Sequence, residues 1–155
     1  MFTRFTTRAR RVLFHARAQV SQLGSRTLEP EHVLLGLLDE GTGLVSRVLA
    51  RTGVGLDDVR GDIVRRLAVG DPVSESDEIP FSGSSTRVVQ YAVEEADRLL
   101  HHEVSTEHLL LGLLREGHSI AADVLAARGA RIDAVREAVV EVRSNGEPSE
   151  PPTAE

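Results

Sequence analysis

The sequence predicts an all-α fold made of two tandem, pseudo-symmetric repeats of four helices each. Aliphatic residues recur at helical spacing along most of the chain, and no segment shows the sustained alternation of a β-strand. Aromatic residues make up only 3% of the 155 residues. The core must therefore consist of Leu, Val, Ile and Ala, which favours helix packing over a β-sandwich.

An internal duplication predicts the number of helices. Glu31 and Glu107 begin nearly the same phrase, 76 residues apart. About a third of all positions are identical at this one offset, without a gap. The matches include Phe5 with Phe81, Val12 with Val88, Gly53 with Gly129, and the run Leu34-Leu35-Gly36-Leu37-Leu38 with Leu110-Leu111-Gly112-Leu113-Leu114.

The first repeat divides into four helices at its Pro and Gly residues. The spacing predicts helices over 6–23, 30–41 and 44–52, and a fourth that begins at Asp57. Pro30 suits a first helical position because it has no N–H group to leave unpaired. Gly41 and Gly53 are typical helix stops.

The second repeat follows the same plan. The expected helices cover 84–100, 106–117 and 120–128, and a fourth begins at Asp133. Ser105 is a good N-cap for the second of them. Gly36 and Gly112 lie inside helices, where glycine costs about 1 kcal/mol relative to alanine. We therefore expect close helix–helix contact at both glycines.

Four segments follow from this pattern. Residues 1–70 form the first repeat and 81–145 the second. Residues 71–80 are acidic and rich in Pro and Ser, so they are predicted to be a linker. Residues 146–155 offer nothing apolar to bury and are predicted to be a disordered tail.

Composition excludes several functional classes. The net charge of −6 argues against nucleic acid as the main partner. The chain has no cysteine, and no lysine for a phosphate-binding loop. No apolar run is long enough to cross a membrane, so we expect a cytoplasmic protein. The first 28 residues hold six arginines and no acid, as a mitochondrial presequence does, but their apolar spacing favours an ordinary helix.

Glu31 and Glu107 stand at the same point of both repeats, in the first turn of a helix. A carboxylate there interacts favourably with the helix dipole, by about 0.3–1 kcal/mol. Alternatively, an exposed carboxylate accepts hydrogen bonds from a guanidinium while N–H groups at the helix end attract an anion. His32 and His108 follow them, and we expect capping or packing roles for both.

One cluster has the residue types of a metal site: His101, His102, Glu103, Glu107 and His108. The first repeat offers only His32 there, so the sequence does not support a repeated metal site. We predict a solvated loop, no bound metal and no cofactor. No nucleophile–base pair or zinc-helix motif occurs either, so no enzymatic activity is predicted.

Three stretches of the sequence resemble the Clp repeat. They are Phe2-Thr3-Arg4-Phe5-Thr6-Thr7-Arg8-Ala9-Arg10-Arg11-Val12, Glu31-His32-Val33-Leu34-Leu35-Gly36-Leu37-Leu38 and Thr106-Glu107-His108-Leu109-Leu110-Leu111-Gly112-Leu113-Leu114-Arg115-Glu116-Gly117. This is the N-terminal domain of ClpA/ClpC-type unfoldases, and the similarity covers about residues 1–145. It implies eight helices, and a surface that receives adaptors and substrates for a ClpP-type protease. The chain ends where an unfoldase continues into ATPase modules, so we expect either an excised domain or, as its tail favours, a free-standing one.

The resemblance also implies binding of phosphoarginine at Glu31 and at Glu107, the latter beside Thr106. Two departures from the family pattern affect these sites. Glu29-Pro30 replaces the usual Gly-Thr, which removes an N–H group and a hydroxyl and adds a negative charge. Gly83-Ser84-Ser85-Thr86 replaces Pro-Arg-Ala-Lys, so basic charge is lost near the second site. The second site, which keeps Thr106-Glu107-His108, is expected to be the better one.

ClpC-type domains are also targets of cyclic-peptide antibiotics, and the resemblance places Phe2 and Phe81 in that region. The leading hypothesis is a non-catalytic module that binds substrates, adaptors or phosphoarginine-marked proteins for Clp-dependent proteolysis. The alternative is a sensor or decoy that sequesters cyclic peptides or other small ligands.

Overall fold

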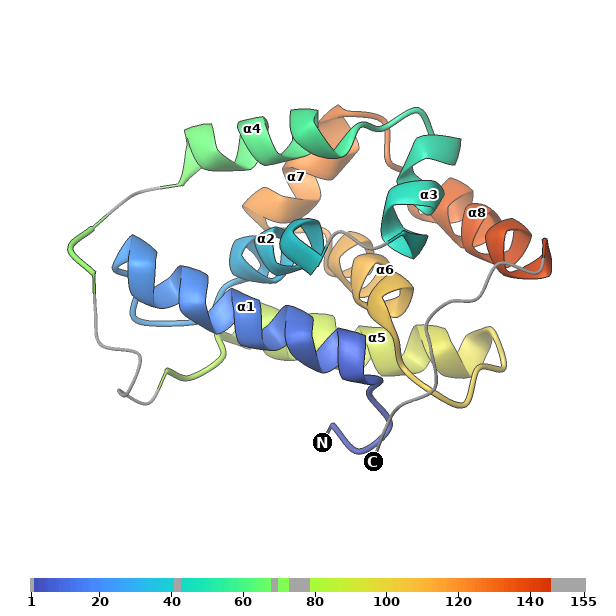
Figure 1. Cartoon of the computed structure of the whole chain (residues 1–155), viewed down its shortest axis with the longest axis horizontal. Helices are drawn as coiled ribbons and strands as arrows, with labels where there is room; N and C mark the ends of the chain where they lie inside the picture. Colours follow the sequence, from blue (N-terminus) through green and yellow to red (C-terminus); the bar gives the residue numbers. More distant parts are fainter. Residues whose placement is uncertain (1, 41–42, 68–69, 73–78, 146–155) are drawn as a thin grey trace.

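The computed structural model describes residues 2–40, 43–67, 70–72 and 79–145. Within these ranges the chain is all-α, with eight helices and no strand (Figure 1). The first repeat contains α1 (Thr7–Leu23), α2 (Pro30–Glu40), α3 (Leu44–Arg51) and α4 (Leu56–Arg66); the second contains α5 (Gly83–Arg98), α6 (Thr106–Glu116), α7 (Ile120–Ala127) and α8 (Ile132–Ser144). The predicted fold class is confirmed.

The helix boundaries follow the expected capping chemistry. Thr6 caps α1, where its hydroxyl accepts a hydrogen bond from the Ala9 N–H. Gly24 and Gly117 end α1 and α6 in the left-handed conformation, with φ of 74° and 73°. Position 100, the counterpart of Gly24, holds a leucine in the same conformation, with φ of 61°. The helix α5 ends at Arg98, two residues before the predicted boundary.

Two short backbone pairings join the repeats. Phe5 pairs with Val104, and Leu28 pairs with Phe81. The 76-residue offset converts Phe5 into Phe81 and Leu28 into Val104, so each pairing is the symmetry mate of the other. The segment that leads into each repeat is therefore hydrogen-bonded to the loop between the first two helices of the other repeat.

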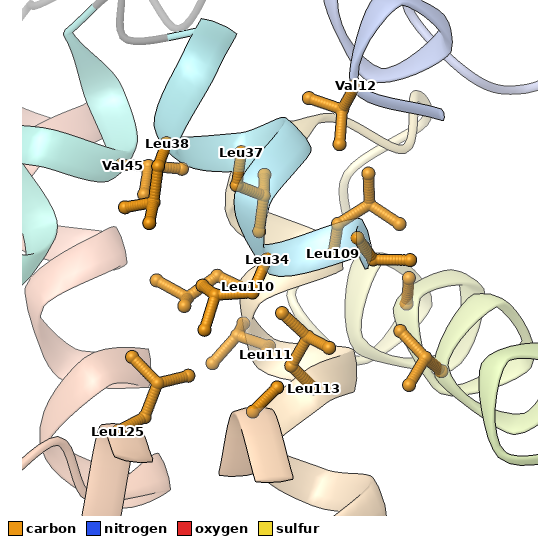
Figure 2. Close-up of a cluster of buried hydrophobic side chains, with 14 of the residues drawn as sticks. Val12, Leu34, Leu37, Leu38, Val45, Leu109, Leu110, Leu111, Leu113 and Leu125 are labelled. Atoms are coloured by element: carbon orange, nitrogen blue, oxygen red, sulfur yellow. The ribbon is translucent and has the colours of Figure 1, made fainter. Parts of the chain in front are cut away.

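The core lies around α2 and α6. All residues of α2 from Pro30 to Leu38 are buried, and α6 is buried from Thr106 to Leu113. Leucines from both helices meet at the centre, where they pack with residues such as Val12, Val45 and Leu125 (Figure 2). Because these two helices are covered on all sides, even their polar first turns are removed from solvent.

The helical glycines allow close helix contact, as predicted. A Cβ atom at Gly36 would lie 2.4 Å from the carbonyl oxygen of Val12 in α1. A Cβ atom at Gly112 would lie 2.4 Å from the carbonyl oxygen of Val88 in α5. Since real Cβ atoms do not approach backbone oxygen this closely, only glycine fits between the paired helices.

Only the ends of the predicted linker fall within the described residues. Asp71 and Pro72 are exposed, but Ile79 is buried against the core. Residues 73–78 and the predicted tail at 146–155 lie outside the described ranges. In the part of the chain that the structure describes, no helix combines the length and the hydropathy needed to cross a bilayer.

Candidate functional site

Glu31 and Glu107 open the two central helices and are both buried. Glu31 is 9% exposed and Glu107 is 0% exposed. The expectation of exposed carboxylates was wrong, because the first turns of α2 and α6 lie within the core that the two repeats share. Thr106, which was assigned to the same site, is buried beside Glu107.

His32 and His108 cap these helices, as expected. The Nδ1 atom of His32 accepts a hydrogen bond from the Glu29 N–H at 2.9 Å, and Nδ1 of His108 accepts one from the Ser105 N–H at 2.8 Å. Burial lowers the pKa of His32. Burial, reinforced by the Arg143 charge, lowers the pKa of His108 to about 3. Both imidazoles are neutral at physiological pH.

Glu107 already holds a guanidinium group. Its Oε2 atom accepts a hydrogen bond from Arg143 of α8, and the two side chains form an ion pair. Its Oε1 atom is buried and has no hydrogen-bond partner among the described residues. Position 67, the counterpart of Arg143 in the first repeat, is a leucine. The first repeat therefore has no arginine at the position equivalent to Arg143.

Glu31 lies in an acidic environment. The described ranges contain all 18 arginines of the chain, and none forms an ion pair with Glu31. Burial raises the pKa of Glu31, and the negative charges of Glu29 and Glu116 raise it further, while backbone N–H groups partly offset the effect. A cation at this position would relieve the repulsion among the three carboxylates.

Of the five candidate metal ligands, the structure brings together His101, Glu107 and His108, whose ligand atoms lie within 4.8 Å of one another. The prediction of a solvated loop was wrong for Glu107 and His108, which are buried, whereas His102 and Glu103 are exposed. His108 Nδ1 accepts the Ser105 N–H, so its Nε2 carries the proton and donates it to His101 Nδ1 at 2.8 Å. This tautomer leaves Nε2 of His108 without a lone pair for a metal.

Phe2 and Phe81 meet where the entry segments of the two repeats lie side by side, with ring centroids 6.1 Å apart. They line an apolar groove of about 280 Å³ that carries two positive charges. The other lining residues are Arg10, Leu13, Arg17, Leu28 and Ile79. The groove combines an apolar floor with guanidinium groups, a surface suited to an amphipathic segment with acidic side chains.

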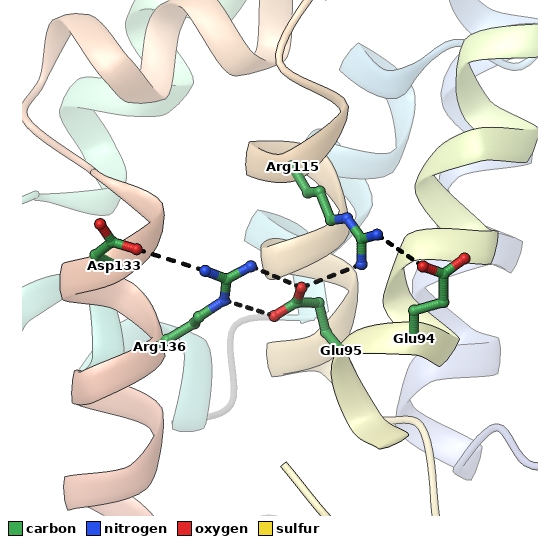
Figure 3. Close-up of polar contacts among 5 residues, drawn as sticks. All are labelled: Glu94, Glu95, Arg115, Asp133 and Arg136. Atoms are coloured by element: carbon green, nitrogen blue, oxygen red, sulfur yellow. Dashed lines mark hydrogen bonds and ion pairs between the residues drawn. The ribbon is translucent and has the colours of Figure 1, made fainter. Parts of the chain in front are cut away.

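A buried ion cluster in the second repeat was missed by sequence reasoning. Glu95 of α5 is 0% exposed and accepts two hydrogen bonds of 2.8 Å from Arg136 and one of 3.3 Å from Arg115 (Figure 3). Arg136, and then the charge of Arg115, hold the pKa of Glu95 below its usual value. The signal that could have found it is an acid on the core-facing side of α5, seven residues after Val88 and three after Ala92.

The fold and these duplicated helix starts define a class, an all-α domain of two tandem four-helix repeats. The chain belongs to the Clp repeat (R) N-terminal domain family, whose model matches residues 4–127 and again 80–155. This confirms the resemblance read from the sequence.

Relatives and solved structures agree with the assignment. The chain is 40% identical over 150 residues to the chloroplastic chaperone protein ClpC1 of Oryza sativa subsp. japonica, covering 97% of this chain and 16% of the relative. The N-terminal domain of ClpD from Arabidopsis thaliana superposes with a TM-score of 0.71 at 26% identity, covering 93% of this chain and 97% of that domain. A ClpV N-domain in complex with a VipB peptide has the same fold, with a TM-score of 0.62 at 17% identity and coverage of 88% and 89%.

Proposed function

We propose that this chain is a non-catalytic receiving module that binds segments of substrate or adaptor proteins for a Clp-type protease in the cytoplasm. The observation that carries the proposal is the groove between Phe2 and Phe81. It lies where the repeats meet, and it combines apolar side chains with Arg10 and Arg17. The ClpV N-domain of the same fold binds a VipB peptide, which supports a peptide-binding role for this architecture.

Peptide titration tests this function. An amphipathic peptide that carries Leu and Glu side chains is expected to bind the full chain. Phe81→Asp should weaken binding by about tenfold or more, because it places a charge in the apolar floor. Phe14→Asp is the matched control, since Phe14 is 72% exposed and does not line the groove. Equal affinities for the Phe81 and Phe14 variants would contradict the assignment.

We further propose that the chain recognises phosphoarginine-marked proteins at Glu31 and at Glu107, the latter beside Thr106. At Glu107 the carboxylate already pairs with Arg143, so the guanidinium group of phosphoarginine has to displace the Arg143 side chain there. At Glu31, the negative charges of Glu29 and Glu116 would repel the phosphate group of phosphoarginine. Phosphoarginine peptides, with Glu31→Gln and Glu107→Gln as variants, test this form.

Sequestration of cyclic peptides is the second candidate function, and the same groove favours it. Its volume of about 280 Å³ and its apolar lining suit part of a cyclic peptide. A ligand present at 100 times its dissociation constant stabilises the fold by about 2.7 kcal/mol. A screen by thermal unfolding should therefore detect such ligands, and Phe81→Asp should abolish the shift.

A further inference from the structure

The exposed face of α1 is basic and carries an aromatic side chain. The helix contains four arginines and no acidic residue. Phe14 lies on this face, 72% exposed, and Arg11, one turn before it, is exposed as well. Arg11 has no ion-pair partner among the described residues, and neither residue lines the groove beside Phe2 and Phe81. Aromatic and arginine side chains are the types that protein–protein interfaces favour.

The exposed face of α8 has the opposite charge around an apolar residue. Asp133, Glu137 and Glu141 recur every four residues along the side of the helix that faces solvent. Val140, next to Glu141, is 47% exposed. Asp133 and Glu141 each pair with one arginine, yet their side chains stay 94% and 50% exposed. Glu137 is exposed and has no ion-pair partner in the described ranges.

The two faces match in spacing as well as in charge. Arg11 precedes Phe14 by three residues, and Glu137 precedes Val140 by three residues. Residues three apart lie on the same side of a helix. Two such helices that lie side by side and point the same way therefore bring the two apolar side chains together. The same arrangement places the two unpaired charges, one positive and one negative, beside each other.

The two faces do not meet within one chain. In Figure 1, α1 runs through the left and centre of the view and α8 lies at its right edge, so neither helix covers the exposed face of the other. Another exposed apolar residue on a helix, Val64, is followed by Arg65 and Arg66, which repel a basic face. Among the described helices that expose a large apolar side chain, α8 is therefore the one whose charge complements α1.

We propose that α1 of one copy of this chain binds α8 of a second copy, with Phe14 against Val140 and Arg11 facing Glu137. The two surfaces differ, so a dimer leaves one surface of each kind unused and association extends beyond two copies. A single pair of helices buries less area than a stable dimer needs, so the contact is weak and depends on protein concentration. This self-association is independent of the proposed receiving function.

Sedimentation equilibrium of the full chain at about 10 μM to about 1 mM covers the range expected for a weak contact. The average mass of the wild type should rise with concentration and exceed twice the monomer mass. Phe14→Asp and Val140→Asp should each weaken association by about tenfold or more, because each places a charge in the apolar contact. Val64→Asp is the matched control and should associate as the wild type does.

Two results of this experiment would overturn the inference. One is a wild type that stays monomeric at the highest concentration. The other is a Phe14→Asp variant that associates as strongly as the wild type. All the substituted side chains are exposed, so the variants are expected to fold, and helical circular dichroism checks this.

A mixture of two variants tests the head-to-tail arrangement. Phe14→Asp keeps its α8 surface, and Val140→Asp keeps its α1 surface. An equimolar mixture should form a dimer with one copy of each and nothing larger, although neither variant associates well alone. A mixture that stays as monomeric as its components would show that α1 does not bind α8.

Exchange of the two unpaired charges tests their pairing. Arg11→Glu and Glu137→Arg should each weaken association by about fivefold, because like charges then face each other. The double variant Arg11→Glu/Glu137→Arg should recover the association of the wild type. If the double variant associates no better than the single variants, Arg11 does not face Glu137 and the proposed contact is wrong.

Discussion

The two repeats place different charges on the same backbone. In the first repeat, Asp39 of α2 accepts hydrogen bonds from Gln19 of α1 at 3.1 Å and from Arg60 of α4 at 2.7 Å. The Asp39 side chain is 27% exposed. Water therefore screens this ion pair, and pairs of this kind contribute roughly 0–1 kcal/mol to stability.

At the three equivalent positions the second repeat has Glu95, Arg115 and Arg136. The acid has moved from the second helix of the repeat to the first, and it is fully buried. The comparison teaches that the duplicated backbone preserves where charges meet but not which helix carries the acid. Since burial makes a broken ion pair expensive, the second repeat should be more sensitive to substitution.

The largest expected effect comes from removing one partner of the buried cluster. Arg136→Ala should lower the free energy of unfolding by about 3 kcal/mol, because Glu95 keeps only the longer contact with Arg115. The matched variant Arg60→Ala, 76 residues earlier, should cost less than about 1 kcal/mol. Urea unfolding of both variants measures the difference, and equal losses would show that the repeats are energetically alike.

Substitution of the buried helical glycines should destabilise the two repeats by the same amount. Gly36→Ala and Gly112→Ala should each lower the free energy of unfolding by about 2 kcal/mol, because the added Cβ is 2.4 Å from a backbone oxygen in both. Gly61 is the control, since its Cβ would meet only the flexible Arg65 side chain. Gly61→Ala should stabilise α4 by roughly 0.5–1 kcal/mol. Thermal unfolding compares all three.

The capping histidines make stability depend on pH. The folded state lowers the pKa of His108 from 6.5 to about 3, so the unfolded state binds more protons between these values. Stability is fully present above pH 6.5 and is lost as the pH falls. His108 alone should cost about 1.4 kcal/mol at pH 5.5.

His108→Gln tests this pH dependence. Glutamine preserves a capping box at this position but does not titrate, so the variant should lose less stability than the wild type between pH 7 and pH 5.5. His118→Gln, at an exposed position, is the control. If His108→Gln keeps the full pH dependence, titration of His108 is not its cause.

The smallest effect concerns the ends of α1 and α5. Leu100 adopts the left-handed conformation that Gly24 adopts in the first repeat, and its side chain is 91% exposed. A side chain in this conformation costs about 1–2 kcal/mol, and this one recovers little by burial. Leu100→Gly should therefore raise the free energy of unfolding by about 1 kcal/mol, as measured by urea unfolding. A loss of stability would indicate that Leu100 makes a favourable contact.

The fold was predictable because the residues that start and stop helices act on the few residues next to them. Gly41 and Gly53 are stop signals of this kind, and the 76-residue offset repeats them at Gly117 and Gly129. The site was only partly predictable. The offset identifies Glu31 and Glu107 as equivalent, but it gives neither their burial nor the arginine that pairs with one of them.

Side-chain pairing was not predictable because the partners are distant in sequence. Arg143 and Glu107 are separated by 36 residues, and Arg136 and Glu95 by 41. The chain has 18 arginines and 24 acids, so many pairings satisfy charge balance. Only the packing of α5, α6 and α8 selects among them.

The exchanged pairings of Phe5 with Val104 and of Leu28 with Phe81 bear on how such a chain assembles. A single repeat cut from this protein would have no partner loop for the backbone N–H and C=O groups of its entry segment. Two copies related by a twofold axis would satisfy them reciprocally, as in a domain-swapped homodimer. Splitting the chain within residues 73–78 should thus give two polypeptides whose helical structure depends on pairing, either with each other or with a second copy of themselves.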